Sequence, residues 1–391
     1  MHSRKKPIVI VGSGFAGINA AFTLRQLNPT IPILVIDSQS KFIFKPLLYE
    51  VLSEEIQEWE VAITFEEVFA NSAITFLKNE LLAVNLEEKC VELKNNMILN
   101  YQYLVISTGS LNNNFSINGV DEYCYFFNNL KDLKNLQIGL KKYLNNSSVH
   151  NLSIIGAGPS GVELACKLSD LYKNKFKISL IERSKEILTN NKIFNREESE
   201  KALHERNIQV LLNTSVQAIF EKKMSLKNKY NDIIKLDHDL VIWTAGIKPN
   251  LPVFDQEIER TNQKVVINTK LQLDSYEDVF VLGDISSIRG FESLPSTAQN
   301  AMQQGIHAGA NLNLLLKGEK LRDYKFIDNG EMISLGLGKA SVSGLGLTLS
   351  GKFAFELRRF IYAAKMPIFQ TSFKSAASWL IKKKNFFTKI N

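Results

Sequence analysis

Gly12-Ser13-Gly14-Phe15-Ala16-Gly17 is the stretch that decides the fold, because it recurs as Gly156-Ala157-Gly158-Pro159-Ser160-Gly161. An apolar run of β type leads into each copy, and a helix-forming run follows it. Glycines at this spacing permit a tight turn and let the backbone approach a pyrophosphate, which the N–H groups of the helix N-terminus can bind. The two copies therefore predict two dinucleotide-binding β-α-β units in one chain.

An acidic residue follows each glycine loop at the end of a second apolar run: Asp37 in the first unit and Glu182 in the second. A carboxylate at this place accepts a hydrogen bond from a ribose hydroxyl. One dinucleotide site would favour a dehydrogenase, whereas two favour a relay of electrons between dinucleotides. We expect a strand over 8–12, a helix over 14–27 and a strand over 33–37, with the second unit over 152–182.

Three further apolar runs end in small residues and predict buried strands. They cover 103–109, 240–246 and 279–284. A long helix is expected over 297–316, and a basic, Asn-rich insertion near 221–231 is typical of a hairpin loop. Because the second unit lies inside the chain before the last of these strands, we expect the first domain to resume after about residue 250.

The cysteines exclude several kinds of site. Cys90, Cys124 and Cys166 lie far apart and form no CxxC pair, which argues against a disulfide framework, a zinc site or a redox-active dithiol. We expect no metal, and Cys166 is expected to be a buried structural thiol. The first strand begins almost at once, and no run of about 18 uncharged apolar residues occurs. These features predict a cytoplasmic protein without a signal peptide or a membrane-spanning helix.

The net charge of +7 is concentrated in the tail. Residues 352–391 hold nine Lys or Arg against a single acid, Glu356, and interleave them with bulky apolar side chains. This pattern is typical of amphipathic helices that lie on an anionic membrane surface. A homodimer contact is an alternative that could coexist with it, and nucleic-acid binding is not expected.

Seven motifs stand in one order along the chain. They are Gly12-x-Gly14-x-x-Gly17, Pro46-Leu47-Leu48-Tyr49, Ser107-Thr108-Gly109, Gly156-x-Gly158-x-x-Gly161-Val162-Glu163-Leu164-Ala165, Trp243-Thr244-Ala245-Gly246, Gly283-Asp284 and Ala298-Gln299-x-Ala301-x-Gln303-Gln304-Gly305. In this order they resemble the pyridine-nucleotide–disulfide oxidoreductase superfamily from Ile8 to about Gly351. Within it the chain looks most like the type II NAD(P)H:quinone dehydrogenases, which do not pump protons.

The resemblance implies FAD in the first unit and NAD(P)H in the second. The residues that it assigns to FAD are Gly12, Gly14, Phe15, Ala16, Gly17, Asp37, Ser38, Thr108, Gly109, Gly283 and Asp284. Those that it assigns to the nicotinamide nucleotide are Gly156, Gly158, Pro159, Ser160, Gly161, Glu182, Arg183, Ala245 and Gly246. The family more often has Glu at the position of Asp37, whose shorter reach could need a bridging water. Ordinary turn chemistry would also explain the Thr-Gly, Ala-Gly and Gly-Asp pairs.

Charge at Glu182 bears on the choice of nucleotide. A carboxylate repels a 2′-phosphate, so NADH is expected before NADPH. Arg183 follows directly and could bind such a phosphate, which keeps NADPH open.

The resemblance also implies a quinone acceptor, since no cysteine pair is present to take electrons from the flavin. Gln299 and Gln303 stand at i and i+4, so both amides could donate to a quinone from one helix face; a solvated face is the alternative. Glu163 resembles a family position near the nicotinamide, and a solvated acid in the first helical turn is the alternative. The residues expected to line an apolar quinone pocket are Phe44, Pro46, Leu47, Tyr49 and Lys339. Ordinary core packing, or a surface position for the lysine, would also explain them.

The sequence therefore predicts an α/β fold with two Rossmann-like domains and a C-terminal basic amphipathic segment. The FAD domain is expected at 1–112 and 251–325, the NAD(P)H domain at 113–250, and the C-terminal segment at 326–391. The predicted activity is electron transfer from NAD(P)H through FAD to a lipid-soluble quinone, at the cytoplasmic face of a plasma or thylakoid membrane. Reduction of a demethylated naphthoquinone in quinone biosynthesis is the alternative within this class. A flavin-containing signalling or nucleic-acid-binding protein is the alternative outside it. Lys45 and Glu50 stand where the family commonly has Gln, so the sequence leaves the quinone open.

Overall fold

The computed structural model describes residues 6–144 and 148–367, which form two compact units. The first unit holds 6–43, 62–111 and 247–327. The second holds 44–61, 112–246 (145–147 aside) and the described residues from 328 on. This division differs from the expected domain boundaries. Residues 44–61 pack with the second unit, as does the segment from 328 to 367 that was expected to stand apart.

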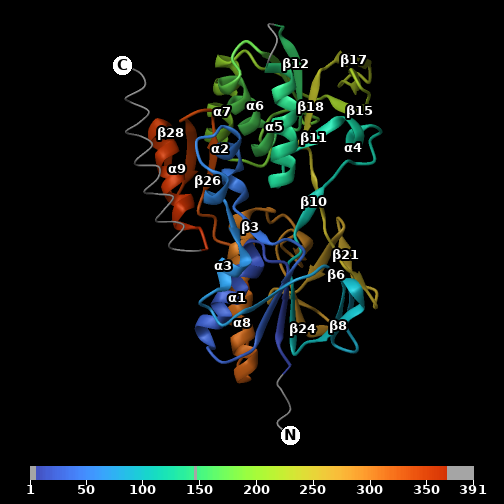
Figure 1. Cartoon of the computed structure of the whole chain (residues 1–391), viewed down its shortest axis with the longest axis vertical. Coiled ribbons are helices and arrows are strands. Elements are labelled where there is room, and N and C mark those ends of the chain that lie inside the picture. The colour runs from blue at the N-terminus through green and yellow to red at the C-terminus, as the bar shows by residue number, and fades with distance from the viewer. Residues whose placement is uncertain (1–5, 145–147, 368–391) are drawn as a thin grey trace. The chain divides into compact units, whose positions relative to one another are not determined.

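A six-stranded sheet in the order β23-β24-β9-β1-β2-β5 forms the centre of the first unit (Figure 1). All neighbouring pairs are parallel except β23 and β24. The strands are β1 (Ile8–Val11), β2 (Ile33–Asp37), β5 (Thr75–Lys78), β9 (Tyr103–Ile106), β23 (Gln272–Leu273) and β24 (Tyr276–Val281). β1 is buried along its whole length, as expected for a central parallel strand. The first glycine loop follows β1 directly, so it lies where the parallel strands of this sheet have their carboxyl ends.

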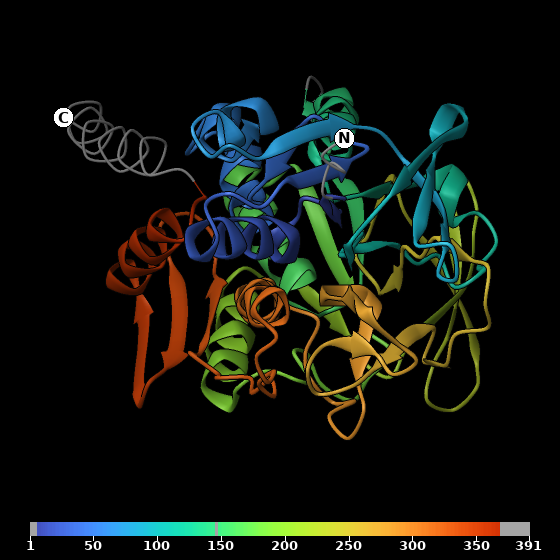
Figure 2. The same ribbon diagram turned by 90° about the horizontal axis from the view of Figure 1, so that it is seen from below.

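Two long helices of the first unit pack against each other: α1 (Phe15–Leu27) and α8 (Ala298–Lys317). In Figure 2 they run side by side. A Cβ added to Gly305 would lie 2.2 Å from the carbonyl oxygen of Ala16, so only glycine permits this approach. The helix expected over 297–316 is thus α8, and the Thr297 side chain caps it by accepting from the Asn300 N–H.

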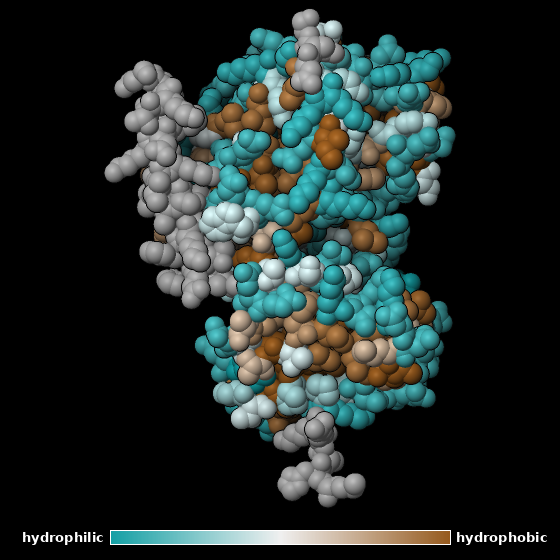
Figure 3. All heavy atoms as spheres, in the orientation of Figure 1, coloured by the Kyte–Doolittle hydropathy of each residue, from teal (hydrophilic) through white to brown (hydrophobic). Residues whose placement is uncertain are grey.

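Smaller elements complete the first unit. They are β3 (Lys41–Ile43), β4 (Ala62–Thr64), α3 (Phe65–Phe69), β6 (Leu81–Asn85), β7 (Cys90–Leu93), η3 (Lys94–Asn96), β8 (Met97–Asn100), β10 (Ser110–Asn112), β19 (Ile247–Pro249), β20 (Val253–Phe254), β21 (Arg260–Thr261), β22 (Lys264–Ile267), η4 (Gly283–Ile285) and β25 (Ser286–Ile288). Hydrophobic side chains gather on the face around β8 and β24 (Figure 3). Met97 and Ile98 of β8 are exposed.

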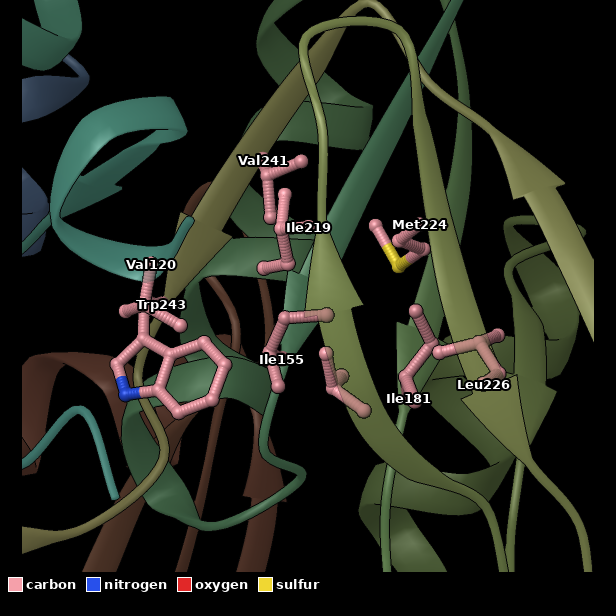
Figure 4. Packing of buried hydrophobic residues seen from close by; sticks show 9 residues of the cluster. Val120, Ile155, Ile181, Ile219, Met224, Leu226, Val241 and Trp243 are labelled. Carbon is pink, nitrogen blue, oxygen red and sulfur yellow. The ribbon is translucent and has the colours of Figure 1, made fainter. Parts of the chain in front are cut away.

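The second unit is built on a five-stranded parallel sheet in the order β11-β18-β12-β13-β14. The strands are β11 (Cys124–Phe126), β12 (His150–Ile155), β13 (Phe176–Ile181), β14 (Gln209–Leu211) and β18 (Leu240–Trp243), and the helices beside them are α4 (Val120–Tyr123), α5 (Leu130–Leu144), α6 (Pro159–Leu171) and α7 (Ile193–Glu205). Ile155, Ile181 and Trp243 pack into one cluster with side chains from the neighbouring antiparallel sheet (Figure 4). Both predicted β-α-β units are therefore present.

The insertion near 221–231 is more ordered than a hairpin loop. Its sheet consists of β15 (Ser215–Ile219), β16 (Lys223–Lys227) and β17 (Ile233–Asp237). The prediction of a loop was wrong for 223–227. Met224 and Leu226 alternate with polar residues and pack into the core, where both are buried. The turn itself spans 228–232.

The remaining elements of the second unit come from both ends of the chain. They are η1 (Lys45–Leu47), α2 (Leu48–Leu52), η2 (Glu58–Glu60), β26 (Glu331–Ser334), β27 (Ala340–Gly344), β28 (Leu347–Gly351) and α9 (Lys352–Ala364). α9 lies across β27 and β28 (Figure 2). Ala354 and Phe355 of α9 pack on Ala340 of β27. α9 thus belongs to a folded core.

Candidate functional site

The first glycine loop turns between β1 and α1. Gly12 adopts a φ of +92°, and a Cβ added to Gly17 would lie 1.8 Å from the Gly12 carbonyl oxygen. Both glycines are therefore required by the fold. Gly14 differs, because a Cβ added there would meet no atom within 4 Å. The space beside Gly14, at the N-terminus of α1, is open to a ligand.

The second glycine loop repeats this geometry between β12 and α6. Gly156 has a φ of +98°, and a Cβ on Gly161 would lie 1.8 Å from the Gly156 carbonyl oxygen. The space beside Gly158 is open, as it is beside Gly14. Pro159 takes the first helical position, where its missing N–H costs no hydrogen bond.

The two acids at the strand ends are held in the same way. The Asp37 carboxylate accepts from the Ser13 N–H at 2.6 Å and the Gln39 N–H at 2.8 Å. The Glu182 carboxylate accepts from the Ala157 N–H at 2.7 Å and the Ser184 N–H at 2.8 Å. Each carboxylate keeps unused lone pairs for ribose hydroxyls. Burial raises the pKa of Asp37 from its ordinary value.

The residues that flank these acids are accessible. Arg183 is exposed directly after Glu182, and Ser38 is exposed after Asp37. In the first loop Ala16 is buried, whereas the ring of Phe15 packs edge-on against Phe42 with 5.3 Å between centroids.

The small residues after β9 and β18 are turn residues with positive φ at glycine. Gly109 has a φ of +71°, and Gly246 has a φ of +73°. Thr108 donates its hydroxyl to the Asn250 carbonyl oxygen, while the Trp243 indole N–H donates to the Ala245 carbonyl at 2.9 Å. The predicted strands over 103–109 and 240–246 accordingly end three residues early. Contact of these turns with a nucleotide stays a prediction.

Gly283 and Asp284 open the short helix η4 after β24. The Gly283 N–H donates to Gln304 Oε1 at 2.6 Å, and Asp284 Oδ2 accepts from the Ser110 hydroxyl at 2.7 Å. Gly283, Asp284 and Gln304 line a small recess together with Thr297, which caps α8. The recess thus places a carboxylate near a helix N-terminus.

Gln299 and Gln303 do share one face of α8, as their spacing predicts. Both amides donate to the carbonyl oxygen of Ile327, at 3.1 Å and 2.8 Å, and Gln303 Oε1 accepts from the Ile327 N–H at 2.9 Å. The chain segment at Ile327 therefore engages these amides in this structure. Their contact with a quinone stays a prediction.

The residues expected to line the quinone pocket lie in the second unit. Phe44, Leu47 and Tyr49 are buried, and Pro46 is half-buried. The Phe44 ring packs against Tyr362 of α9 with 5.5 Å between centroids. The Lys339 side chain is half-exposed, and its Nζ is 3.8 Å from a carboxylate oxygen of Glu205 on α7. Its place at the mouth of a quinone pocket stays a prediction.

Glu163 on α6 is buried, so it is not the solvated acid that was the alternative. Its Oε1 accepts from the Ser334 N–H at 2.8 Å and lies 3.5 Å from Nη2 of Arg358. Burial raises the pKa of Glu163 from 4.5 to about 7, against the opposing pull of the Arg358 charge. Glu163 can therefore take up or release a proton near neutral pH.

Glu163 and four other buried or largely buried charged side chains form a group that we call the ionic cluster. Its members are Glu50, Glu55, Glu163, Lys167 and Arg358. Arg358 pairs with Glu50, and Lys167 pairs with Glu55. Arg358, Glu50 and Lys167 are fully buried. The cluster joins α2 to α6 and α9.

Sequence reasoning missed the central member of the ionic cluster. Arg358 was counted among the bases that face lipid, and that interpretation is wrong for this residue because it is fully buried and paired. The helical spacing of Ala354, Phe355 and Tyr362 places Arg358 on the inner face of α9, and this was the available signal. Glu50 was noticed only as a departure from the expected Gln.

The outer face of α9 keeps the expected amphipathic character. Phe353 and Phe360 are 71% and 70% exposed. Leu345 and Leu347, in the hairpin beside α9, are exposed as well. The later tail residues on which the membrane prediction also rests, such as Phe373, Trp379 and Phe386, lie outside the described residues.

The cysteines are free: Cys90 and Cys166 are buried, and Cys124 is half-buried. Burial raises the pKa of Cys166 to about 12, so this thiol is inert at neutral pH, as expected of a structural cysteine. Within residues 6–144 and 148–367 no group of three or more His, Cys, Asp or Glu side chains is arranged to hold a metal ion.

Comparison with known proteins agrees with this geometry. The family model for pyridine nucleotide-disulphide oxidoreductases matches residues 6–305. The chain belongs to this family. It is 33% identical to the demethylphylloquinone reductase NdbB of Synechocystis, over 98% of this chain and 97% of that protein. It is 30% identical to the alternative NAD(P)H-ubiquinone oxidoreductase C1 of Arabidopsis thaliana, over 97% and 81% of the two chains.

The fold also matches a solved structure. The NDH2 of Plasmodium falciparum in complex with NADH superposes with a TM-score of 0.86 at 20% identity, covering 97% of this chain and 98% of that one. The predicted family and the α/β fold with two Rossmann-like domains are therefore confirmed.

Proposed function

We propose that this protein is an FAD-dependent enzyme that transfers electrons from NAD(P)H to a lipid-soluble quinone. The observation that carries the proposal is the pair of equivalent sites, one in each unit. Each has an open position beside its middle glycine, a helix N-terminus and an anchored acid. Two dinucleotide sites in one chain are the requirement of an electron relay.

FAD fits the first unit. The open space beside Gly14 admits a pyrophosphate, and Asp37 has lone pairs left for a ribose. We propose that Asp284, which lines a small recess, binds the chain between ring and phosphate. Bound FAD would supply the two-electron redox chemistry between nucleotide and quinone. The residues 1–112 and 251–325 remain our proposal for its domain, apart from the segment 44–61.

NAD(P)H fits the second unit. Gly158 leaves the same open space, and Glu182 is placed to accept from ribose hydroxyls. The structural relative from Plasmodium was solved with NADH, which supports this ligand class. We propose NADH before NADPH because Glu182 would repel a 2′-phosphate, although the exposed Arg183 beside it favours one.

A quinone is the proposed acceptor because the curated relatives of 30% identity and above are named for quinone reduction. Reducing a quinone to a quinol consumes two protons as well as two electrons. Glu163 is the buried group suited to hold one of them, because its pKa is about 7. Gln299 and Gln303 remain our candidates for donors to the quinone carbonyls, once they part from Ile327.

We further propose that the protein lies on an anionic membrane surface. The exposed Phe353 and Phe360 of α9 and the basic composition of 352–391 support this. No helix in the described part of the chain is long and apolar enough to cross a membrane. A homodimer contact through the same apolar face is the alternative.

Steady-state kinetics test the function. The holoenzyme should oxidise NADH or NADPH with ubiquinone, plastoquinone or naphthoquinone analogues as acceptor. Reduction of a protein acceptor but of none of these quinones would contradict the proposal.

A second candidate function is the reduction of a demethylated naphthoquinone for quinone biosynthesis. The 33% identity to the demethylphylloquinone reductase favours it, since that relative is matched over 97% of its length. A demethylnaphthoquinone with a kcat/KM well above that of ubiquinone would support it. The reverse order would favour a respiratory or redox-balancing role.

A further inference from the structure

Tyr49 makes its polar contact on the nucleotide-binding side of the second unit. Its hydroxyl donates to the Ser160 hydroxyl oxygen at 2.9 Å. Its ring packs against Phe127, at the end of β11, with 5.0 Å between centroids. Tyr49 is buried and Ser160 is half-buried, so this hydrogen bond is partly shielded from water. The contact is with the second glycine loop, which was not expected for a residue of the quinone pocket.

Ser160 occupies the second position of α6, directly after the open space at Gly158. Pro159 before it has no N–H, and the Val162 N–H already bonds the Gly158 carbonyl at 3.1 Å. The N–H groups of Ser160 and Gly161 are therefore the ones that this helix terminus offers to a phosphate. The Ser160 hydroxyl lies at the same terminus.

The direction of the hydrogen bond leaves the serine proton unused. Burial, together with the nearby negative charge of Glu163, raises the pKa of Tyr49 well above its usual range. In the hydrogen bond that the structure has, the Tyr49 hydroxyl donates and the Ser160 oxygen accepts. A hydroxyl that accepts in this way still has its own proton to donate.

Tyr49 itself is held firmly from two directions. Glu50, the next residue of α2, pairs with Arg358 of α9, and Glu55 just beyond α2 pairs with Lys167 of α6. The first pair fixes α2 to α9, and the second fixes the segment just beyond α2 to α6, the helix that follows the second glycine loop. The tyrosine hydroxyl is thereby preorganised toward Ser160.

We propose that Tyr49 is a positioning residue for the nicotinamide nucleotide. It holds the Ser160 hydroxyl so that this hydroxyl donates to a phosphate oxygen of NAD(P)H at the N-terminus of α6. This assignment rests on the proposed function for the identity of the nucleotide. It moves Tyr49 from the quinone pocket to the nucleotide site.

The test separates the two half-reactions of the FAD-loaded enzyme. Flavin bleaching is followed by stopped flow against the concentration of NADH and of NADPH, which gives a dissociation constant for each, and reoxidation is followed with a soluble quinone. Tyr49→Phe should raise the nucleotide dissociation constant about 3- to 10-fold, the effect of one lost hydrogen bond. Reoxidation by quinone should be unchanged.

Ser160→Ala tests the same link from its other end. It should raise the nucleotide dissociation constant about 10-fold, because the donor itself is removed. The double variant Tyr49→Phe/Ser160→Ala should bind the nucleotide no more weakly than Ser160→Ala does, since Tyr49 acts through Ser160. Tyr143→Phe is the matched control: Tyr143 lies in the same unit and donates to the Asp239 carbonyl at 2.8 Å. It should leave nucleotide affinity unchanged.

Several outcomes would overturn the proposal. They are an effect of Tyr49→Phe on the quinone step alone, unchanged nucleotide affinity in Tyr49→Phe or in Ser160→Ala, and additive effects in the double variant. If Tyr49→Phe fails to fold, an unchanged affinity in Ser160→Ala still overturns it. Failure of the proposed function is seen separately, as flavin bleaching by nucleotide without reoxidation by any quinone.

Discussion

Replacing Arg358 by Met is expected to destabilise the second unit strongly. Arg358 and its partner Glu50 are both fully buried, and Nη2 of Arg358 also donates to the Pro46 carbonyl at 2.8 Å. Methionine keeps much of the aliphatic volume and removes the charge. Glu163 can then take a proton, whereas Glu50 is left as a buried charge without a partner. Breaking a buried ion pair in this way costs about 3 to 5 kcal/mol of unfolding free energy.

Removing both charges should cost less than removing one. The variant Glu50→Gln/Arg358→Met leaves no buried carboxylate at position 50, so it should be about 2 kcal/mol more stable than Arg358→Met. Arg358→Lys is the control that keeps the charge and loses the forked geometry of the guanidinium. Its free energy of unfolding should lie between those of wild type and Arg358→Met.

Urea unfolding of the FAD-loaded enzyme, followed by tryptophan fluorescence, measures these differences. Trp59 in η2 and Trp243 in β18 both belong to the second unit, so their emission reports on it, whereas the third tryptophan, Trp379, lies outside the described residues. A loss below about 1 kcal/mol for Arg358→Met would show that the pair is not buried as described. The reasoning would equally be refuted if the loss of unfolding free energy in the double variant equalled the sum of the losses in Glu50→Gln and Arg358→Met.

Three further predictions concern protonation, the glycine loops and the membrane face. The raised pKa of Glu163 means that the folded enzyme holds a proton which the unfolded chain loses near pH 4.5, so the extra stability is present below that pH and is lost as the pH rises through about 7. Relative to Glu163→Gln, wild type should lose up to about 3 kcal/mol between pH 5 and 8 in urea titrations, and a flat difference would contradict the shift. Gly158→Ala should fold and retain flavin but bind NAD(P)H at least about 10-fold more weakly, because its new methyl group would occupy space that we assign to the ligand. Gly161→Ala should fail to fold, because its methyl group would clash with the Gly156 carbonyl. Thermal melts measure folding and stopped-flow bleaching measures affinity, and full nucleotide affinity in Gly158→Ala would place the phosphate elsewhere. Phe353→Ser/Phe360→Ser should reduce flotation with anionic liposomes while leaving the melting temperature within a few degrees, since both rings are exposed, and unchanged flotation would assign this face to another contact.

Point variants test the outer face of α9 better than a truncation does, because the inner face of α9 is part of the core. Truncation at Gly351 would remove Phe355 and Arg358 together with the exposed rings. Loss of liposome binding by such a fragment would then report unfolding as readily as loss of a membrane contact. Substitutions on the outer face separate the two causes.

The local parts of the fold were predictable from sequence. Strand, glycine loop, helix, strand and acid are fixed by neighbours within about thirty residues, and the structure has them at β1 to Asp37 and at β12 to Glu182. The Thr297 cap and the extent of α8 follow from equally local signals.

Contacts between distant residues were not predictable. Glu50 and Arg358 are separated by 308 positions, and nothing near either residue indicates the other. Gly305 illustrates the same limit, because its need for glycine comes from the Ala16 carbonyl of another helix. The engagement of Gln303 by Ile327 depends on a returning chain segment whose sequence carries no special pattern.

Burial raises the pKa of Glu163 to about 7, and the cations of the ionic cluster offset this rise only in part. Three carboxylates, Glu50, Glu55 and Glu163, face two cations, Lys167 and Arg358. Arg358 and Lys167 each have a closer partner than Glu163, which leaves the third carboxylate with the weakest compensation in a buried place. Protonation of Glu163 removes the excess negative charge at the lowest cost in free energy. The pKa of Glu163 therefore depends on α2 and α9 as well as on its own helix, so a change in either element should alter it.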